Sequence, residues 1–420
     1  MNEKQYKPDW WLFVATLVLL SFGVTMVFDA SYPHALEMHH DEWFFFKRQA
    51  LWAGIGLACM FITAKIRFWK WQAFAVPALG LSILMLIAVK FMGHGAQGAQ
   101  RWIGVGQLRI QPSEFAKLGI VFYLARVFAA RPRAVGDFWK GIVPLFSVAL
   151  ISIILVERQP DLGTAITMLL TGLIILYAAG ARPAWVAGIL AVCMLCGFGM
   201  VVKNGTDNYR FKRLTTFINP KADELRSGYQ IIHSTIALGT GGATGLGFGE
   251  SREKRLGNLP AQRTDFIFAI IGEEFGLAGT CCVIILFVFL GGRGLHIAHR
   301  TKDPFGALLA TGITAMISVQ ALVNIGVVSA SIPATGVPLP FISYGGSSLV
   351  PTLMGIGILL NISRYPNRVD PKPSARRKRA EIDDEPEPRT AATLRGSALS
   401  ASLAVARVSR GDAGVRERVS

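Results

Sequence analysis

The chain has 420 residues, of which 52% are hydrophobic and 17% are charged, and its mean hydropathy is +0.43. A soluble domain averages about 45–50% apolar and about 25% charged residues, so this composition leans toward a membrane protein. The formal net charge is +16. Much of that charge lies beside apolar runs or in the C-terminal tail, where basic residues set topology and contact anionic lipid, so nucleic acid is not a predicted partner.

Uncharged apolar runs predict ten transmembrane helices. A run of about 18 or more residues with few charges is long enough to cross a bilayer. The first run is too long and too poor in small residues to be a cleaved signal peptide, so it is interpreted as a signal anchor. The predicted segments lie at about 11–28, 48–64, 72–91, 114–130, 141–157, 160–180, 183–202, 265–291, 306–331 and 340–362.

The basic residues of the connections predict the orientation. Thirteen lysines and arginines lie in connections on the N-terminal side of the predicted membrane, against six in the short connections on the other side. Because cytoplasmic loops carry the excess of basic residues, both termini are predicted to be cytoplasmic. The expected fold is an all-α integral membrane protein, with residues 1–10 as the N-terminus and residues 11–366 as the membrane domain. Residues 367–420, which lack aromatics, predict a disordered cytoplasmic tail.

Residues 203–264 form one long extracytoplasmic connection between predicted helices seven and eight. A connection of this length is usually functional or disordered. Within it, "GYQIIHSTIALGTGG" has the spacing of an amphipathic helix, with Ile232 and Ile236 on one face and His233 and Ser234 on another. The sequence therefore predicts a helix that lies at the membrane interface or over a cavity.

All five cysteines fall inside apolar runs. Cys193 and Cys196 have CxxC spacing, but no second pair or histidine ligand follows at zinc spacing. Buried, inert thiols are therefore predicted.

Ionisable residues within membrane segments are candidates for function because their burial is costly. In "QPSEFAKLGIV", Glu114 and Lys117 are three residues apart and share a helix face. Two interpretations stay open for them. They form a self-neutralising pair that joins helices, or they offer a positive group to a phosphate.

Two clusters at the predicted outer edge allow similar alternatives. Arg48, in "FFFKRQALW", is explained equally well by snorkelling and by substrate binding. In "ERQPDLGTA", Glu157, Arg158 and Asp161 surround a tight turn, for which a structural corner is favoured over a ligand contact.

The stretch "LPAQRTDFIFAIIGEEFG" carries Asp265 directly from the long connection into the eighth segment. An aspartate in this position often caps its own helix, although Thr264 could serve as the cap instead. The alternative is a carboxylate that acts on a substrate at the outer boundary. Glu273 and Glu274 lie two turns further on, where structural roles with buried partners are expected.

The stretch "PATGVPLPFISYGGSS" interrupts the helical pattern before the tenth segment. Proline removes a backbone donor, and each backbone group freed within a membrane needs a partner. We expect this segment to lie against protein or a polar cavity. Ser343, Gly345, Gly346 and Ser347 are candidates for the wall of a binding site, and a helix-packing face of small residues is the alternative.

Five ordered motifs resemble those of one membrane protein family. They are "QPSEFAKL", "QPDLGTA", "GYQIIHSTIALGTGG", "TDFIFAIIGEEFG" and "PLPFISYGGSS". Across about residues 8–366 the chain resembles the SEDS family (shape, elongation, division and sporulation), which includes FtsW and RodA. The stretch "FGESREKRLGNLPAQRTDF" is more similar to the FtsW branch, with RodA as the nearest alternative. The chain departs from the typical division motifs at Glu250, Ala261, Gln262 and Arg263.

The resemblance implies a peptidoglycan glycosyltransferase that polymerises lipid II into β-1,4 glycan at the outer face of the bacterial cytoplasmic membrane, in cell division at the septum. It implies attack of a GlcNAc 4-hydroxyl on the anomeric carbon of MurNAc, with inversion and loss of undecaprenyl pyrophosphate. Asp265 matches the family's catalytic aspartate, and a positioned base of this kind contributes about 10²–10⁴-fold. A divalent cation, Mg²⁺ or Mn²⁺, is also implied, with Asp265 as a candidate ligand.

Cations that stabilise the departing pyrophosphate are the second requirement of this chemistry. The candidates for binding the substrate are Arg48, Lys117 with Glu114, Arg210 and Arg213. The four small residues of the last motif are expected to line the outward-facing site.

The resemblance also implies partners. A class B penicillin-binding protein would cross-link the new strand, other division proteins would bind, and membrane lipid would surround the helices. Three alternatives remain: an elongation-type RodA polymerase, a transporter or flippase for the lipid-linked precursor, and a non-catalytic scaffold. A transporter would need its charges near the midplane, whereas a polymerase needs Asp265 at the outer edge.

Overall fold

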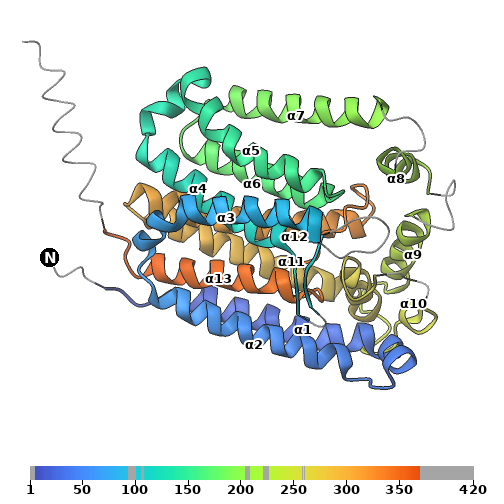
Figure 1. Cartoon of the computed structure of the whole chain (residues 1–420). Helices are drawn as coiled ribbons and strands as arrows, with labels where there is room; N and C mark the ends of the chain where they lie inside the picture. The colour runs from blue at the N-terminus through green and yellow to red at the C-terminus, as the bar shows by residue number, and fades with distance from the viewer. Residues whose placement is uncertain are drawn as a thin grey trace, which may run out of the picture. The chain divides into compact units, whose positions relative to one another are not determined.

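A computed structural model describes residues 5–92, 101–105, 108–203, 209–220, 227–257, 259 and 261–368. Helices dominate the described part of the chain (Figure 1). The predicted tail lies outside the described residues from residue 369 onward. In chain order the elements are α1 (Trp10–His39), α2 (Phe44–Lys65), η1 (Phe68–Lys70), α3 (Trp71–Met92), β1 (Ile103–Val105), β2 (Leu108–Ile110), α4 (Pro112–Ala130), η2 (Pro132–Gly136), η3 (Phe138–Ile142), α5 (Val143–Glu157), α6 (Leu162–Ala178), α7 (Pro183–Lys203), α8 (Tyr209–Ile218), α9 (Ser227–Thr240), α10 (Arg252–Arg255), α11 (Ile267–Arg300), α12 (Pro304–Val328) and α13 (Gly346–Ser363).

The helices α1 to α7 and α11 to α13 overlap the predicted membrane segments. Within the described residues, six stretches are long and apolar enough to cross a membrane; they lie in α1, η1 with α3, η3 with α5, α11, α12 and α13. Helices α6 and α7 contribute shorter apolar segments. The chain is therefore an all-helical, multi-pass membrane protein, while ten crossings and the orientation of the ends stay predictions.

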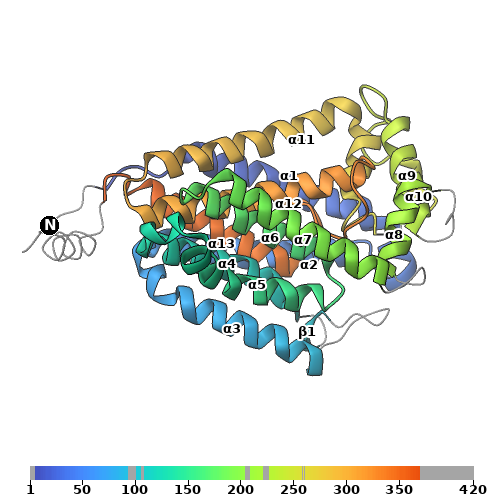
Figure 2. The same cartoon turned by 90° about the horizontal axis from the view of Figure 1, so that it is seen from above.

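The bundle has central and peripheral helices. In α12 and α13, 78% of the most apolar 18-residue stretch of each helix is buried inside the protein. The corresponding share is 28% in α11 and in the stretch that contains α3. Figure 2 shows α11 on one side of the bundle and α3 on the other, with α12 and α13 between them. Helices α4 and α6 pack against α12 in this centre. The central helices therefore support the connections that lie at their ends.

Aspartates define where several helices begin. Asp9 accepts a hydrogen bond from the Leu12 amide at 3.0 Å, and Asp303 accepts one from Gly306 at 3.1 Å. A side-chain acceptor in this position satisfies one of the amides that the first helical turn leaves unpaired. These caps fix the first turns of α1 and α12.

Helix α11 is interrupted at Gly276, which has φ 64° and ψ −159°. This left-handed conformation favours glycine because no Cβ is present to clash. The backbone of the preceding connection pairs with the helix around the break: Leu246 donates to the Glu273 oxygen at 3.0 Å, and Leu277 donates to the Gly242 oxygen at 2.9 Å. The segment from Gly242 to Leu246 thus satisfies backbone groups that the break would otherwise leave unpaired.

The structure differs from the predicted boundaries at three places. Helix α13 begins at Gly346 rather than near residue 340, and α1 and α11 extend to His39 and Arg300. The segment before Gly346 is not helical, because Phe341 has a φ of 64° and Gly345 a φ of 176°, both outside the range of an α-helix. A short antiparallel hairpin, in which Ile103 pairs with Ile110, was not predicted.

Helix α9 is present as predicted, with Ser234 and Ile236 on different faces, and the face that carries Ser234 is the buried one. Ser234 and Ala237 are fully buried, whereas Ile236 is 42% exposed. The Ser234 hydroxyl donates to the Val328 oxygen of α12 at 2.7 Å. Small and hydrogen-bonding residues let this helix pack closely on α12, which leaves an isoleucine to face outward.

The prediction of buried thiols is also wrong. The five cysteines form no disulfide, Cys196, Cys281 and Cys282 are exposed, and Cys59 and Cys193 are partly exposed. Lipid tails are as apolar as a protein core, so an apolar run in a membrane protein includes residues on the outside of the bundle.

Candidate active site

Asp265 lies immediately before α11 and does not cap it. Phe266 occupies the cap position, where no side-chain cap bond forms. The Thr264 hydroxyl donates to the Ala261 oxygen at 3.1 Å, so it does not cap the helix either. Within the part of the chain that the structure describes, no group donates a hydrogen bond to the Asp265 carboxylate, which is partly exposed. The capping interpretation is therefore wrong, and the carboxylate is available to another molecule.

The surroundings of Asp265 make it a stronger base than an ordinary carboxylate. Burial raises the pKa of Asp265 to about 6. Arg213 opposes this rise in pKa, Asp161 adds to it, and Arg101 opposes it more weakly. Desolvation thus dominates over the nearby charges, as expected for a carboxylate at the edge of a protein interior. Near neutral pH the group is largely ionised and has an increased affinity for a proton.

Two amide side chains of α12 hold the backbone around Asp265. The Asn324 amide donates to the backbone oxygens of Asp265 and Val337, each at 2.8 Å. Gln320, one helical turn earlier, donates to the Pro338 oxygen at 2.9 Å. Both amides are buried. They supply donors to carbonyls that lie outside any helix, which is the compensation that broken backbone requires in a membrane protein.

The segment between α12 and α13 passes beside the carboxylate. Ser343 links this segment to the chain before α11: its hydroxyl donates to the Thr264 oxygen at 2.6 Å and accepts from the Leu339 amide at 2.8 Å. A Cβ placed on Gly336, which has a φ of +77°, would lie 3.6 Å from Asp265 Oδ2. The prediction that this segment lies against protein is confirmed, and its backbone forms part of the surroundings of Asp265.

Two arginines from different parts of the chain bring positive charge to Asp265. Arg213, on α8, donates from Nη1 to the Ala334 oxygen at 2.8 Å. Arg101 donates from Nε to the Gln159 oxygen at 3.1 Å. Both act electrostatically on the Asp265 carboxylate. Arg213 was among the predicted site residues, whereas Arg101 was missed because nothing in its local sequence links it to residue 265.

Asp161 occupies the corner that the sequence predicted. Its carboxylate accepts from Gln111 Nε2 at 3.0 Å and from the Thr164 amide at 3.3 Å, which caps α6. The predicted structural role is confirmed. Because Asp161 also raises the pKa of Asp265, the same corner lies close enough to influence the candidate base.

Glu114 and Lys117 form the predicted ion pair, with 2.8 Å between Glu114 Oε2 and Lys117 Nζ. Both side chains are almost completely buried, at 2% and 4% exposure. Lys117 also donates to Gln320 Oε1, so the pair is joined to the amide that holds Pro338. The structural interpretation is confirmed, and contact between Lys117 and a phosphate stays a prediction.

The other predicted cations are less closely connected to Asp265. The Arg48 guanidinium carbon lies 5.0 Å from the centre of the Phe44 ring on α2. The backbone of Arg210 belongs to α8, but its side chain lies outside the described part of the structure. Their substrate contacts stay predictions.

The small residues that begin α13 have packing roles in the structure. Gly345 donates its amide to Gln49 Oε1 at 3.4 Å, and Ser347 is buried. A Cβ added to Gly346 would lie 2.1 Å from the Trp52 ring. These contacts correspond to the packing alternative, and contact with substrate stays a prediction.

The close approach at Gly346 leads to a stability prediction. Gly346→Ala should lower the free energy of unfolding by about 1–3 kcal/mol, because the methyl group overpacks against Trp52. Gly54→Ala, on the facing helix α2, has no atom within 4 Å of the added Cβ and should be neutral or stabilising. Thermal unfolding of both variants in detergent measures the difference, and equal unfolding midpoints would refute the packing role.

Arg263, at one of the departures from the division motif, contacts Phe45 and Tyr344. Its guanidinium carbon lies 4.2 Å from the centre of the Phe45 ring. Its backbone oxygen accepts from the Tyr344 amide at 2.8 Å. Burial lowers the pKa of Arg263. The residue therefore connects the chain before α11 to α2 and to the segment before α13.

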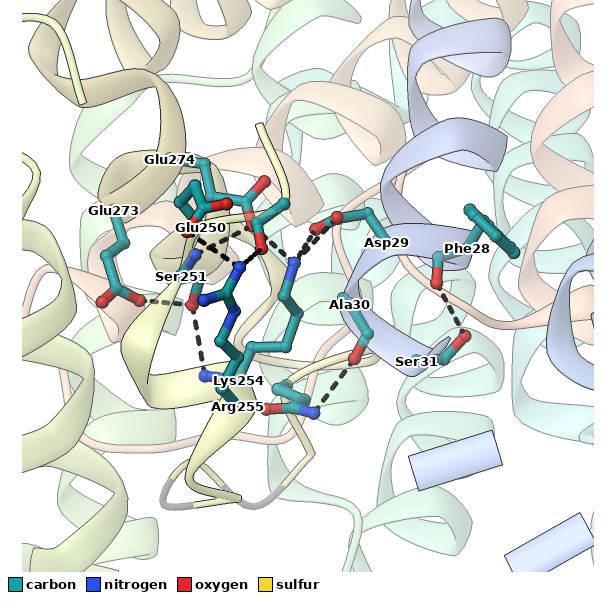
Figure 3. A network of polar contacts seen from close by, with 12 residues as sticks. Phe28, Asp29, Ala30, Ser31, Glu250, Ser251, Lys254, Arg255, Glu273 and Glu274 are labelled. Carbon is teal, nitrogen blue, oxygen red and sulfur yellow. Dashed lines mark hydrogen bonds and ion pairs between the residues drawn. The ribbon is translucent and has the colours of Figure 1, made fainter. Parts of the chain in front are cut away.

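A buried ionic network fixes the connection that leads to Asp265 (Figure 3). Lys254 Nζ lies 2.7 Å from both carboxylate oxygens of Asp29 on α1 and 2.6 Å from Glu274 Oε1 on α11. All three side chains are buried. The sequence analysis gave no role to Asp29 and Lys254. An aspartate inside an apolar helix does, however, indicate a buried partner or a function.

Glu273 completes this network at the start of α10. It accepts from the Ser251 hydroxyl and, at 2.9 Å, from the Arg252 amide. Close by, Gln262 donates to the Ala30 oxygen of α1 at 3.0 Å. The predicted structural partners of the two glutamates are therefore present, and they attach the residues before Asp265 to α1 and α11.

The described residues contain no cluster of three or more His, Cys, Asp or Glu side chains that could hold a metal ion. Magnesium is commonly bound through one or two carboxylates together with the phosphates of a substrate. Asp265, whose carboxylate accepts no hydrogen bond from the described residues, fits that arrangement only in the presence of a phosphate ligand.

Together, the fold and the site define a multi-pass helical membrane protein with a partly exposed candidate base just before α11 and two arginines that act on it electrostatically. A family model described as "Cell cycle protein" (FTSW_RODA_SPOVE) matches residues 10–368. The chain belongs to this family, which the sequence resemblance had indicated as SEDS.

Individual relatives cover most of the chain. It is 42% identical over 367 residues to stage V sporulation protein E of Bacillus subtilis (strain 168), covering 87% of this chain and 99% of that protein. It is 38% identical over 366 residues to a Geobacter metallireducens protein named "Probable peptidoglycan glycosyltransferase FtsW", covering 86% of this chain and 96% of the relative.

Solved structures agree with the family assignment. A chain from a study titled "Structural coordination of polymerization and crosslinking by a peptidoglycan synthase complex" matches with a TM-score of 0.70 and 29% identity, covering 86% of this chain and 99% of that one. The rod shape determining protein RodA of Thermus thermophilus matches with a TM-score of 0.64 and 26% identity, covering 86% and 98%.

Proposed function

We propose that this protein is a peptidoglycan glycosyltransferase that polymerises lipid II at the outer face of the cytoplasmic membrane, with Asp265 as general base. The observation that carries the proposal is the Asp265 carboxylate, which lies beside α11 without capping it and has a pKa raised to about 6. The names of the relatives support the glycosyltransferase class. Similarity to both sporulation and FtsW proteins is compatible with a role in septal wall synthesis.

In the proposed reaction, Asp265 takes the proton of the GlcNAc 4-hydroxyl as its oxygen attacks the anomeric carbon of MurNAc. The bond to undecaprenyl pyrophosphate breaks, the electron pair leaves with the pyrophosphate, and the anomeric configuration inverts. A sugar hydroxyl is a weak nucleophile at neutral pH, so a positioned base accelerates the step. Arg213 and Arg101 place positive charge near the carboxylate, where it would stabilise the departing phosphate oxygens.

A divalent cation, Mg²⁺ or Mn²⁺, belongs to the same proposal. The described residues would hold it through Asp265 together with pyrophosphate oxygens of the substrate, because they contain no larger acidic cluster. When bound, the ion would neutralise charge on the leaving group. Chelation with EDTA should therefore reduce activity, and added Mg²⁺ or Mn²⁺ should restore it.

A class B penicillin-binding protein is the proposed partner. The solved peptidoglycan synthase complex, to which the chain is similar, couples polymerization with crosslinking according to its title. The decisive experiment incubates labelled lipid II with the purified protein and its cognate transpeptidase. Long, muramidase-sensitive glycan strands are the expected product.

Two other results of that experiment would replace the proposal. Translocation of lipid II across proteoliposomes without glycan synthesis would identify a transporter. Neither activity, with the partner demonstrably bound, would identify a scaffold. Complementation of division, elongation and sporulation mutants would then separate the FtsW-like role from that of RodA.

The raised pKa of Asp265 predicts an acid limb in the pH–rate profile. The carboxylate is the active form, so kcat/KM should fall as pH decreases through about 6, the pKa of the group. An ordinary aspartate would show this fall near pH 4. Rates measured from about pH 5 to 8 provide the test, with circular dichroism to confirm that the fold persists. A pH-independent rate across this range would contradict the role of Asp265 as base.

A further inference from the structure

A second candidate site lies at the opposite end of α11 from Asp265. It is a cavity of about 470 Å³ between the start of α1, the end of α11 and the residues that follow α13. Helices α1 and α11 pack side by side (Figure 2). The lining residues of the cavity come from the start of α1 and the last turns of α11. Its volume falls within the range of about 300–1,000 Å³ that is typical of small-ligand sites.

The wall of this cavity is fixed by backbone contacts. The Tyr6 amide donates to the Arg364 oxygen at 2.9 Å, and the Asp9 amide donates to Ser363 Oγ at 3.1 Å. The Lys302 amide donates to the Pro366 oxygen at 2.9 Å just behind it. These bonds hold the residues before α1 against those after α13, so the cavity belongs to the folded bundle.

The lining of the cavity is basic. Lys7, Arg293 and Arg300 are cationic, and Asp9 is the carboxylate among the lining residues. Asp9 is already engaged, since it caps α1 and forms a two-point contact with Arg293. Positive charge therefore exceeds negative charge in the cavity. Because the Asp9 carboxylate pairs with Arg293, it does not neutralise Lys7 or Arg300.

Three polar side chains of the lining have no partner among the residues that the structure describes. Within the described residues, Lys7, His296 and Arg300 make no hydrogen bond or ion pair through their side chains. Each can donate to an anion, and Arg300 can do so with two parallel bonds to a phosphate. An anionic ligand with phosphate oxygens matches this set of donors.

The surface beside the cavity is apolar and exposed. Trp10 and Trp11 are 59% and 65% exposed at the start of α1. Val14 and Val18 continue the exposed face along the same helix, one and two turns beyond Trp11. Tryptophan is typical of the membrane–water interface, and the aliphatic side chains beyond it match acyl chains. A soluble phosphate compound would make no use of this surface.

We propose that this cavity binds the phosphate head group of an anionic phospholipid, with the acyl chains along the exposed face of α1. Basic pockets between membrane helices on the cytoplasmic side recognise such head groups. The predicted orientation places the cavity in the inner leaflet, away from Asp265. The site would anchor the N-terminal end of α1 to α11 through the lipid.

The test counts lipids bound to the purified full-length protein by native mass spectrometry. Cardiolipin and phosphatidylglycerol should bind more tightly than phosphatidylcholine. The double variant Lys7→Gln/Arg300→Gln should weaken the binding of anionic lipid by roughly 30-fold, because each basic residue near an anionic surface contributes about fivefold. The control, Lys65→Gln/Lys302→Gln, removes the same charge from exposed residues at the same end and should retain binding.

Two outcomes would overturn the proposal. Equal loss of lipid in both double variants would show that only the total positive charge of this end attracts lipid. Displacement of lipid by glycerol phosphate, with the same dependence on Lys7 and Arg300, would assign the cavity to a soluble phosphate compound. Binding is the readout, so neither result depends on the glycosyltransferase proposal.

Discussion

Asp265→Asn is expected to reduce lipid II polymerisation by at least about 10²-fold, because the amide cannot accept a proton from the attacking hydroxyl. The amide has nearly the same shape as the carboxylate. Since Asn324 bonds to the backbone oxygen of residue 265, the local fold should survive the substitution. Glycan synthesis with the bound partner provides the measurement. The matched control is Glu250→Gln, an exposed acidic residue that pairs with Arg255 at the surface.

Stability distinguishes loss of catalysis from loss of structure in this variant. The pKa of Asp265 is about 6 in the folded protein, compared with about 3.9 in an unfolded chain. The folded state therefore binds the proton more tightly, and the carboxylate lowers stability progressively as pH rises from about 4 to 6. Asp265→Asn removes this effect, so at neutral pH the variant should unfold no more easily than the parent. An active variant would exclude Asp265 as the base, whereas an inactive and unstable one would point to a structural role.

Hydropathy predicted the positions of the membrane helices correctly. A helix that crosses a membrane must be long and apolar, and both properties can be read from a short stretch of sequence. Hydropathy located the ends of the helices less well. Helix α11 continues to Arg300, well past the predicted end at 291. Hydropathy marks only the apolar part of a helix, whereas the helix itself can continue through polar residues beyond that part. Helix α13 starts later than predicted because Phe341 and Gly345 have non-helical backbone angles, which hydropathy does not report.

The candidate base was predictable, but the residues that hold it were not. Asp265 attracted attention because it enters an apolar segment directly from a long connection. Asn324 and Gln320 donate hydrogen bonds to the backbone oxygens of Asp265 and Pro338, which lie elsewhere in the sequence. No local sequence pattern could therefore predict these contacts. Their signal was weaker: two amides four residues apart, on one face of an otherwise apolar helix.

The burial of residues in apolar runs was predicted least well. The rule that apolar residues point inward fails when the surroundings are lipid, as the exposed Cys281 and Cys282 show. In α9, the buried positions belong to Ser234 and Ala237, where close approach matters more than hydrophobicity. Small and hydrogen-bonding residues therefore form the buried face of this helix.

Lys254→Met is expected to cause the largest loss of stability among single substitutions in the connection before Asp265. Removal of the ammonium group leaves Asp29 and Glu274 buried without their cation, and Glu274 Oε2 already has no hydrogen-bond partner in the described structure. Breaking a buried ion pair in this way costs about 3–5 kcal/mol. The measurement is the unfolding midpoint in detergent, together with limited proteolysis of the segment around α10.

Two further variants separate the ionic network from general damage to this segment. Arg255→Met removes an exposed partner of Glu250, a surface pair worth at most about 1 kcal/mol. Adding Asp29→Asn and Glu274→Gln to Lys254→Met should recover much of the loss, because no unpaired buried charge then remains. Failure of the triple variant to recover would mean that Lys254 acts through packing. Recovery of stability without glycan synthesis would instead show that the charged network is needed to position the chain leading to Asp265.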